Sequence, residues 1–231
     1  MKFRNPFRDL TKIEWGLWLI SVVAVIASYL AAGGEGLLNM IASLIGVTAL
    51  IFIAKGYVIG QVLTVIFAIF YGIVSFFFHY YGEMITYLCM TAPIAMISII
   101  SWLRHPYEDT KEVEVAHVTK RQVFVMVILA VMVTIAFYFI LAFLGNANLF
   151  FSTISVTTSF VACYLAFLRS PYYALGYAAN DIVLIVLWVM ATMEELSYLP
   201  MVICFVMFLV NDLYGYYNWK KMRKRQEQAT A

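Results

Sequence analysis

The sequence predicts an all-helical membrane protein with eight transmembrane helices. Three observations support this fold class. Hydrophobic residues make up 64% of the chain and charged residues only 12%, which is too little polar surface for a water-soluble domain. The apolar runs are about twenty residues long, the length at which a helix crosses the hydrocarbon layer, whereas a transmembrane barrel shows shorter alternating segments. The basic residues, finally, are confined to alternate connections between these runs.

Breaks in the apolar pattern place the eight helices along the chain. The first run follows a basic N-terminal segment and is too long for the apolar core of a signal peptide, so we interpret it as a retained helix. Glycine-rich connections separate several of the later runs. Ser170 and Pro171 are typical of the N-cap and first position of a helix. The predicted spans are residues 14–32, 37–54, 58–79, 84–103, 123–144, 149–168, 172–193 and 199–219.

The distribution of charge predicts the orientation of these spans. If the N-terminus is cytoplasmic, eight spans place all 15 lysines and arginines on the cytoplasmic side. The outer connections then contain only acidic charges, from Glu35, Glu83, Glu194 and Glu195. A seven-span interpretation leaves some bases outside, against the positive-inside rule. We therefore expect a multi-pass protein of the inner or plasma membrane with both termini in the cytoplasm.

The segments outside the spans carry no recognisable site. The connection 104–122 has mixed charges, and its histidines lack metal-ligand spacing, which favours a solvated linker. We expect the basic tail to lie against lipid headgroups rather than to bind nucleic acid. The three cysteines, Cys89, Cys163 and Cys204, fall inside apolar runs, so we expect neither a disulfide nor a metal site.

A repeat relates spans two to four to spans six to eight. Aligning Gly60 with Gly176 brings Trp102 onto Trp219 after one residue of slippage. Two parallel three-helix units need an odd number of linking helices, which the fifth span supplies. The predicted divisions are the N-terminus with an extra first helix (1–36), the first repeat (37–103), the linker with its helix (104–148), the second repeat (149–219) and the basic tail (220–231).

Polar side chains follow one face of the middle helix in each predicted repeat. In span three they recur at steps of three and four, from Gln61 toward His79, and in span seven Asn180 and Asp181 lie near mid-span. An acid at bilayer depth costs roughly 2.5–3.5 kcal/mol, so it persists where it faces protein or water. Hydrogen bonding between helices is the alternative to cavity lining. We favour a cavity because both middle helices carry their strongest polar groups there.

Aromatic residues share these faces and complete the candidate site. Trp188 lies on the same face as Asp181, which favours a platform for an aromatic substrate over a place in the interfacial belt. Trp102 and Trp219, nearer to helix ends, are predicted to be interfacial anchors. The candidate substrate-binding residues are Gln61, Thr64, Tyr71, Tyr177, Asn180, Asp181, Trp188, Asn211 and Tyr214.

No catalytic arrangement is present in the sequence. At membrane depth it has no histidine and glutamate cluster spaced for zinc, no paired serine and lysine, and no phosphate-binding glycine loop. We therefore expect a carrier without cofactor or metal, and not an enzyme. A proton-coupled carrier that uses Asp181 or Asp212 as relay is one alternative. A scaffold that transports nothing is another, but it gives no reason for matched polar faces in both repeats.

The residues resemble those of a known family, the PnuC-type vitamin transporters. NDLYG at Asn211 to Gly215 fits the family's NxxY signature on the last helix, and NDIVLIVLW at Asn180 to Trp188 lies on the helix before it. The first repeat adds YYGEMITY and TAPIAMISIISWLRHP, so the resemblance covers about Leu37 to Trp219. The family's WxxW pair is not evident here, since Ala174 and Tyr177 occupy the expected positions.

This resemblance implies a three-plus-one-plus-three helix fold, similar to that of the SWEET sugar carriers, in a homotrimer. It implies facilitated diffusion of nicotinamide riboside into the cytoplasm, where a separate kinase traps it. Thiamine and riboflavin remain alternative substrates, because relatives of the same fold are associated with them. We expect Trp188 and Tyr214 to contact the ring of the substrate. Its carboxamide and ribose would bond to Gln61, Thr64, Asn180 and Asn211.

Overall fold

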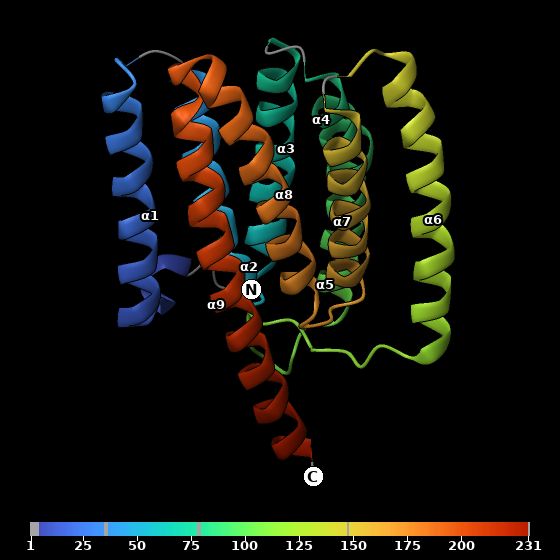
Figure 1. Ribbon diagram of the computed structural model, residues 1–231. Coiled ribbons are helices and arrows are strands. Elements are labelled where there is room, and N and C mark those ends of the chain that lie inside the picture. Colours follow the sequence, from blue (N-terminus) through green and yellow to red (C-terminus); the bar gives the residue numbers. More distant parts are fainter. Residues whose placement is uncertain (1–4, 35–36, 78–79, 147, 231) are drawn as a thin grey trace.

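A computed structural model describes residues 5–34, 37–77, 80–146 and 148–230 of the chain. Within these ranges, eight helices are long and apolar enough to cross a membrane. They stand side by side in one bundle, and both chain ends lie at the same end of it (Figure 1). We call this the termini end and the opposite one the far end. The predicted all-helical class and the number of spans are confirmed.

Seven of the eight spans are single helices, and the fourth is divided. It consists of α4, a π-helical stretch at Thr86–Thr91, and α5. Single turns of 3-10 helix at Pro6–Asp9 and Leu196–Tyr198 precede the first and last helices. In chain order the helices are α1 (Lys12–Ala31), α2 (Leu37–Ala54), α3 (Val58–Phe77), α4 (Tyr81–Ile85), α5 (Ala92–Arg104), α6 (Lys120–Phe143), α7 (Leu149–Phe167), α8 (Tyr173–Glu194) and α9 (Leu199–Thr230).

Local sequence determines where helices begin. Thr11 caps α1, and the side chain of Glu14 accepts a hydrogen bond from the cap's N–H at 2.7 Å, so two otherwise unpaired donors are satisfied. The predicted N-cap at Ser170 is wrong. Ser170 and Pro171 lie in a turn in which the Ser170 carbonyl accepts from the Tyr173 N–H at 3.1 Å, and α8 begins at Tyr173.

The division of the fourth span has two consequences. Pro93 is the second residue of α5, and because proline lacks an N–H it cannot continue the regular hydrogen-bond pattern of the preceding turn. The wider turns of the π-helical stretch lie directly before it. At the other end, Glu83 was predicted to lie in an outer connection, which is wrong. It is the third residue of α4 and only 4% exposed.

The packing order places α2, α3, α8 and α9 at the centre. α2 packs against α3 and α9, and α9 packs against α8. α7 packs against α8, while α5 contacts both α3 and α7. α1 lies along α2 and α9 at one edge of the bundle, and α6 lies along α7 at the opposite edge (Figure 1). The central helices are thus covered on both sides.

Polar contacts attach α1 to the bundle. Glu14, which is buried, has its Oε2 atom 3.0 Å from Lys55 Nζ, and its Oε1 atom accepts from the Tyr214 hydroxyl at 3.2 Å. A buried carboxylate requires such partners to offset its loss of hydration. Further along α1, Ser21 Oγ accepts from Asn211 Nδ2 at 3.0 Å. Side chains from α9 and from the α2–α3 connection therefore hold α1 in place.

Trp102 and Trp219 are not the interfacial anchors that the sequence predicted. Each is at most 1% exposed, and their ring centroids are 5.4 Å apart. Trp102 Nε1 donates to the Ala166 carbonyl at 3.0 Å, and Trp219 Nε1 donates to the Ile53 carbonyl at 2.8 Å. Because carbonyls near the ends of α7 and α2 satisfy both indole N–H groups, the rings do not need the polar surface of the membrane.

The linker and the tail pack together at the termini end. The Gln226 side chain accepts from the Val115 N–H at 2.8 Å and donates to the Val113 carbonyl at 3.1 Å. Lys111 Nζ lies 2.6 Å from Asp9 Oδ2 and so ties the linker to the N-terminal segment. Part of the tail therefore contacts protein rather than the lipid headgroups predicted for it.

Candidate functional site

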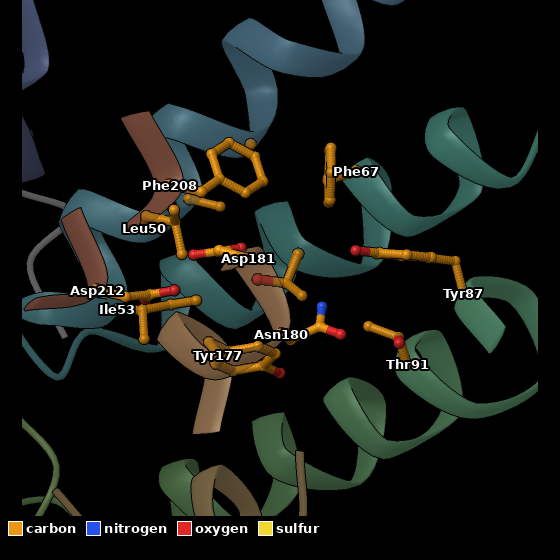
Figure 2. A pocket seen from close by; sticks show the side chains of 13 residues that line it. Leu50, Ile53, Phe67, Tyr87, Thr91, Tyr177, Asn180, Asp181, Phe208 and Asp212 are labelled. Atoms are coloured by element: carbon orange, nitrogen blue, oxygen red, sulfur yellow. The ribbon is translucent and has the colours of Figure 1, made fainter. Parts of the chain in front are cut away.

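A small cavity of about 40 Å³ lies at the centre of the bundle. It is enclosed by α2, α3, α8 and α9, with the π-helical stretch on one side (Figure 2). Its wall is mainly aromatic and aliphatic with a few polar groups, the composition typical of sites for small organic ligands. The lining residues are Gly46, Ala49, Leu50, Ile53, Thr64, Phe67, Tyr87, Thr91, Tyr177, Asn180, Asp181, Phe208 and Asp212.

Two carboxyl groups meet on one side of this cavity. Asp181 of α8 and Asp212 of α9 are each 3% exposed, and both line the cavity. Two neighbouring buried carboxyl groups disfavour the state in which both are ionised. Asp181 Oδ2 has no hydrogen-bond partner among the described residues.

Asn180 is fixed in one orientation by α7. Its Oδ1 atom accepts from Ser155 Oγ at 3.1 Å and from Thr158 Oγ1 at 2.9 Å. With the oxygen occupied in this way, the amide nitrogen is directed toward the middle of the cavity (Figure 2). Asn180 therefore presents a hydrogen-bond donor to a ligand.

Two further polar side chains of the wall are held by their neighbours. Thr64 Oγ1 donates to the Gly60 carbonyl of its own helix at 3.0 Å. The Tyr177 hydroxyl lies 3.2 Å from Cys163 Sγ, and its ring borders the cavity (Figure 2). A ligand in the cavity thus meets one hydroxyl and one ring that are already positioned.

An aromatic cluster closes the cavity toward the far end. Trp188 Nε1 donates to the Tyr71 hydroxyl at 3.1 Å, which joins α8 to α3. The ring centroid of Tyr71 lies 4.4 Å from that of Tyr87, and the Phe67 centroid lies 5.8 Å from that of Tyr87. On the other side of Trp188, the Tyr80 ring is 5.0 Å away, edge to face. Passage through this end requires these rings to move.

A match to a family model decides the classification. The model described as nicotinamide mononucleotide transporter matches residues 36–221. The chain belongs to the nicotinamide mononucleotide transporter family. This is a family of membrane transporters rather than of enzymes, and the predicted resemblance to PnuC-type transporters is confirmed.

Individual relatives agree with this assignment. The nicotinamide riboside transporter PnuC of Neisseria mucosa is 31% identical over 229 residues, which cover 96% of this chain and 86% of that protein. The transporter of the same name from Haemophilus influenzae is 26% identical, with 90% of each chain covered. The crystal structure of the vitamin B3 transporter PnuC matches with a TM-score of 0.81 at 27% identity and covers 94% of both chains.

In this member of the nicotinamide mononucleotide transporter family, four of the nine candidate residues line the central cavity. They are Thr64, Tyr177, Asn180 and Asp181. Tyr71 and Trp188 belong to the aromatic cluster at its far end. Gln61 is buried in α3 at 3% exposure, outside the set of lining residues. His79 lies outside the described residues.

The last two candidates, Asn211 and Tyr214, turn away from the cavity. Asn211 Nδ2 donates to Ser21 Oγ and, at 2.7 Å, to the Met207 carbonyl, while the Tyr214 hydroxyl donates to Glu14. Both side chains therefore hold α1, and neither lines the cavity. The sequence indicated that they share a helical face but not that α1 covers it.

Several lining residues were absent from the candidate set. Phe67 lies three residues after Thr64 on α3, and Asp212 follows Asn211 in the same way that Asp181 follows Asn180, so both had a signal in the sequence. Tyr87 and Thr91 belong to the π-helical stretch, whose altered register a regular helical wheel does not reproduce.

Proposed function

We propose that this protein carries nicotinamide riboside across the membrane through the central cavity, by facilitated diffusion. The relatives in Neisseria mucosa and Haemophilus influenzae carry that substrate in their names. The observation that carries the proposal is the composition of the cavity wall. It combines a pair of carboxyl groups, several aromatic rings and a donor amide.

Each part of nicotinamide riboside has a counterpart in this wall. The positively charged pyridinium ring fits the Asp181–Asp212 pair and the faces of Phe67 and Tyr177. The carboxamide oxygen can accept from Asn180, and ribose hydroxyls can bond to Asp181 Oδ2. When one carboxyl group of the pair is ionised, its negative charge balances the single positive charge of the ring, so the complex is neutral at membrane depth.

The same wall disfavours nicotinamide mononucleotide, the substrate in the family description. The charge of a phosphate group needs a basic partner, but none of the residues that line the described cavity is lysine, arginine or histidine. An unpaired buried charge costs several kcal/mol. We therefore expect uptake of labelled riboside into proteoliposomes to exceed that of the nucleotide at least about tenfold, for which about 1.4 kcal/mol suffices.

Thiamine and riboflavin are the comparison substrates in this uptake experiment. Thiamine also carries a cationic ring, whereas riboflavin is neutral and larger. Equal uptake of riboside and nucleotide, or preferred uptake of either vitamin, would contradict the assignment of nicotinamide riboside.

The cavity has to open before it can hold a nucleoside. Its volume of about 40 Å³ is far below the roughly 300–1,000 Å³ of typical ligand pockets, so we assign this structure to a closed state. We propose that opening moves two three-helix repeats, 37–103 and 149–219, relative to each other. The crossed hydrogen bonds of Trp102 and Trp219 support this division, because each joins the last helix of one repeat to the first helix of the other.

Close helix contacts in corresponding positions also support the repeats. Gly60 of α3 lies against the backbone of α2 at Ile53, and Gly176 of α8 lies against the backbone of α7 at Ala162. The two glycines are aligned in the sequence. We assign 1–36 to the extra helix, 104–148 to the linker and its helix, and 220–231 to the tail.

Orientation and assembly follow from charge and exposure. All 15 lysines and arginines lie outside the outer connections of the predicted topology, so we propose that the termini end faces the cytoplasm. We further propose a homotrimer. Ala130 and Leu141 are the buried residues of α6, which leaves most of this helix to lipid or to a neighbouring copy. A separate cytosolic kinase would trap the imported riboside.

Proton coupling is the second candidate mechanism. The neighbouring buried carboxyl groups of Asp181 and Asp212 favour it, because such a pair can bind and release a proton as the cavity opens to either side. An uncoupler distinguishes the two mechanisms. Under facilitated diffusion the initial rate of uptake into proteoliposomes is unchanged by an imposed pH gradient and by its collapse, whereas coupled transport stops when the gradient is removed.

A further inference from the structure

Glu83 is a buried acid that the proposed central site does not use. It lies one turn inside the far end of the bundle, on α4, and is 4% exposed. Neither of its carboxylate oxygens has a hydrogen-bond partner among the residues that the structure describes. An unpaired buried carboxylate costs several kcal/mol, so a proton or a cation has to balance it.

A second, smaller cavity adjoins this carboxyl group. Its volume is about 10 Å³, and none of the residues that line it is basic. Trp188 belongs to its wall and also, through the bond to Tyr71, to the aromatic cluster that closes the central cavity. The two cavities therefore lie one after the other along the bundle axis, and Trp188 separates them. The lining residues are Tyr80, Glu83, Asn146, Ser152, Leu184, Leu187 and Trp188.

The polar neighbours of Glu83 are engaged with one another. Asn146 Oδ1 accepts from the Gly82 N–H at 3.2 Å, and Asn146 Nδ2 donates to Ser152 Oγ at 2.8 Å. Ser155 lies beside Glu83, but its hydroxyl donates to Asn180. These bonds fix the shape of the cavity, and the carboxylate of Glu83 remains available to bind a ligand.

Aromatic rings make this cavity suited to a planar cation. Tyr80 and Trp188 meet edge to face at 5.0 Å, and both rings line the cavity that contains the carboxylate. Burial, together with the neighbouring Tyr198 and nearby acids, raises the pKa of Tyr80 to about 12, so its ring remains a neutral phenol at physiological pH. A cationic ring here gains both charge pairing and cation–π attraction.

We propose that Glu83, Tyr80 and Trp188 form an outer binding station for the cationic ring of the substrate. The substrate occupies this station before Trp188 moves and admits it to the central cavity. The ligand class is an N-substituted pyridinium or a similar aromatic monocation. The proposal rests on the proposed function, since it assigns a first binding step to the same substrate. In the closed state the station is too small for a ring, so it opens together with the aromatic cluster.

The test compares Glu83→Gln with the wild-type protein for two substrates that differ in charge. Nicotinamide riboside is cationic, and its 1,4-dihydro form has nearly the same shape but a neutral ring. We expect the substitution to raise KM for the cation about tenfold in proteoliposomes and to change uptake of the neutral form less than twofold. Glu194→Gln, which removes an exposed carboxylate at the same end, is the matched control. We expect it to leave the KM for the cation and the uptake of the neutral form unchanged.

Three results would overturn the outer station. They are unchanged uptake of both substrates, an equal loss for both, which indicates a structural role, and a loss only of response to a pH gradient, which indicates a proton site. If Glu83→Gln does not fold, Tyr80→Leu replaces it and should raise KM selectively for the cation. Absence of riboside uptake by the wild-type protein itself would instead reject the proposed function.

Discussion

Asn180→Ala is expected to reduce uptake of nicotinamide riboside roughly 10- to 100-fold. The substitution removes the donor directed into the cavity and the oxygen that accepts from the hydroxyl of Ser155. Loss of a buried hydrogen-bond partner costs about 1–3 kcal/mol, which corresponds to this range. The measurement is the initial rate of uptake by proteoliposomes over a range of substrate concentrations, with equal amounts of inserted protein.

Asn211→Ala is the matched control for that experiment. Asn211 also precedes an aspartate near the middle of a spanning helix, but its amide donates to Ser21 of α1. We expect Asn211→Ala to lower the melting temperature and to change KM less than threefold. Equal losses of transport in the two variants would contradict the assignment of Asn180 to the cavity and Asn211 to the attachment of α1.

Gly60→Ala is expected to be the most destabilising single methyl addition in the bundle. A Cβ atom on Gly60 would lie 2.5 Å from the Ile53 backbone nitrogen and 2.9 Å from the Phe52 carbonyl carbon, so α3 has to move away from α2. Overpacking typically costs about 1–3 kcal/mol, and a clash with backbone, which cannot rotate away, places this substitution at the upper end. For a protein of this length the melting temperature should fall by roughly 6–12 °C.

The control for this substitution is Gly16→Ala. Gly16 lies within α1, and no heavy atom lies within 4 Å of the Cβ position there. Alanine favours the helix by about 0.5–1 kcal/mol over glycine, so stability should be unchanged or slightly increased. Thermal unfolding of both variants in the same detergent measures the difference. A Gly60→Ala protein as stable as wild type would show that the α2–α3 contact is not as close as described.

The sequence predicted the spans well because membrane insertion is a local property. Each segment's length, hydropathy and neighbouring basic residues can be assessed without knowledge of the other segments. The end of α2, for example, agrees with the prediction to the residue. Asn180 and Asp181 could be found for the same reason, since a polar pair at bilayer depth has to face the bundle interior or a cavity rather than lipid.

The direction of each helical face could not be predicted in the same way. Periodicity indicates that Asn211 and Tyr214 share a face, but not that α1 lies against it. Similarly, a tryptophan near a helix end, such as Trp219, is typical of an interfacial anchor. The Trp219 side chain is instead buried, and its indole N–H donates to a carbonyl of α2. Glu83 was placed in a connection because Gly82 precedes it, although α4 already begins at Tyr81. The first two errors come from contacts between segments distant in the sequence, whereas the third comes from the position at which a helix begins.

The most direct test of the central claim is a structure determined with nicotinamide riboside bound. The proposed function predicts an opened central cavity with the pyridinium ring beside the Asp181–Asp212 pair and the carboxamide within hydrogen-bonding distance of Asn180. A riboside bound only in the groove between α6 and α7, or between copies of the chain, with the central cavity still closed, would contradict it.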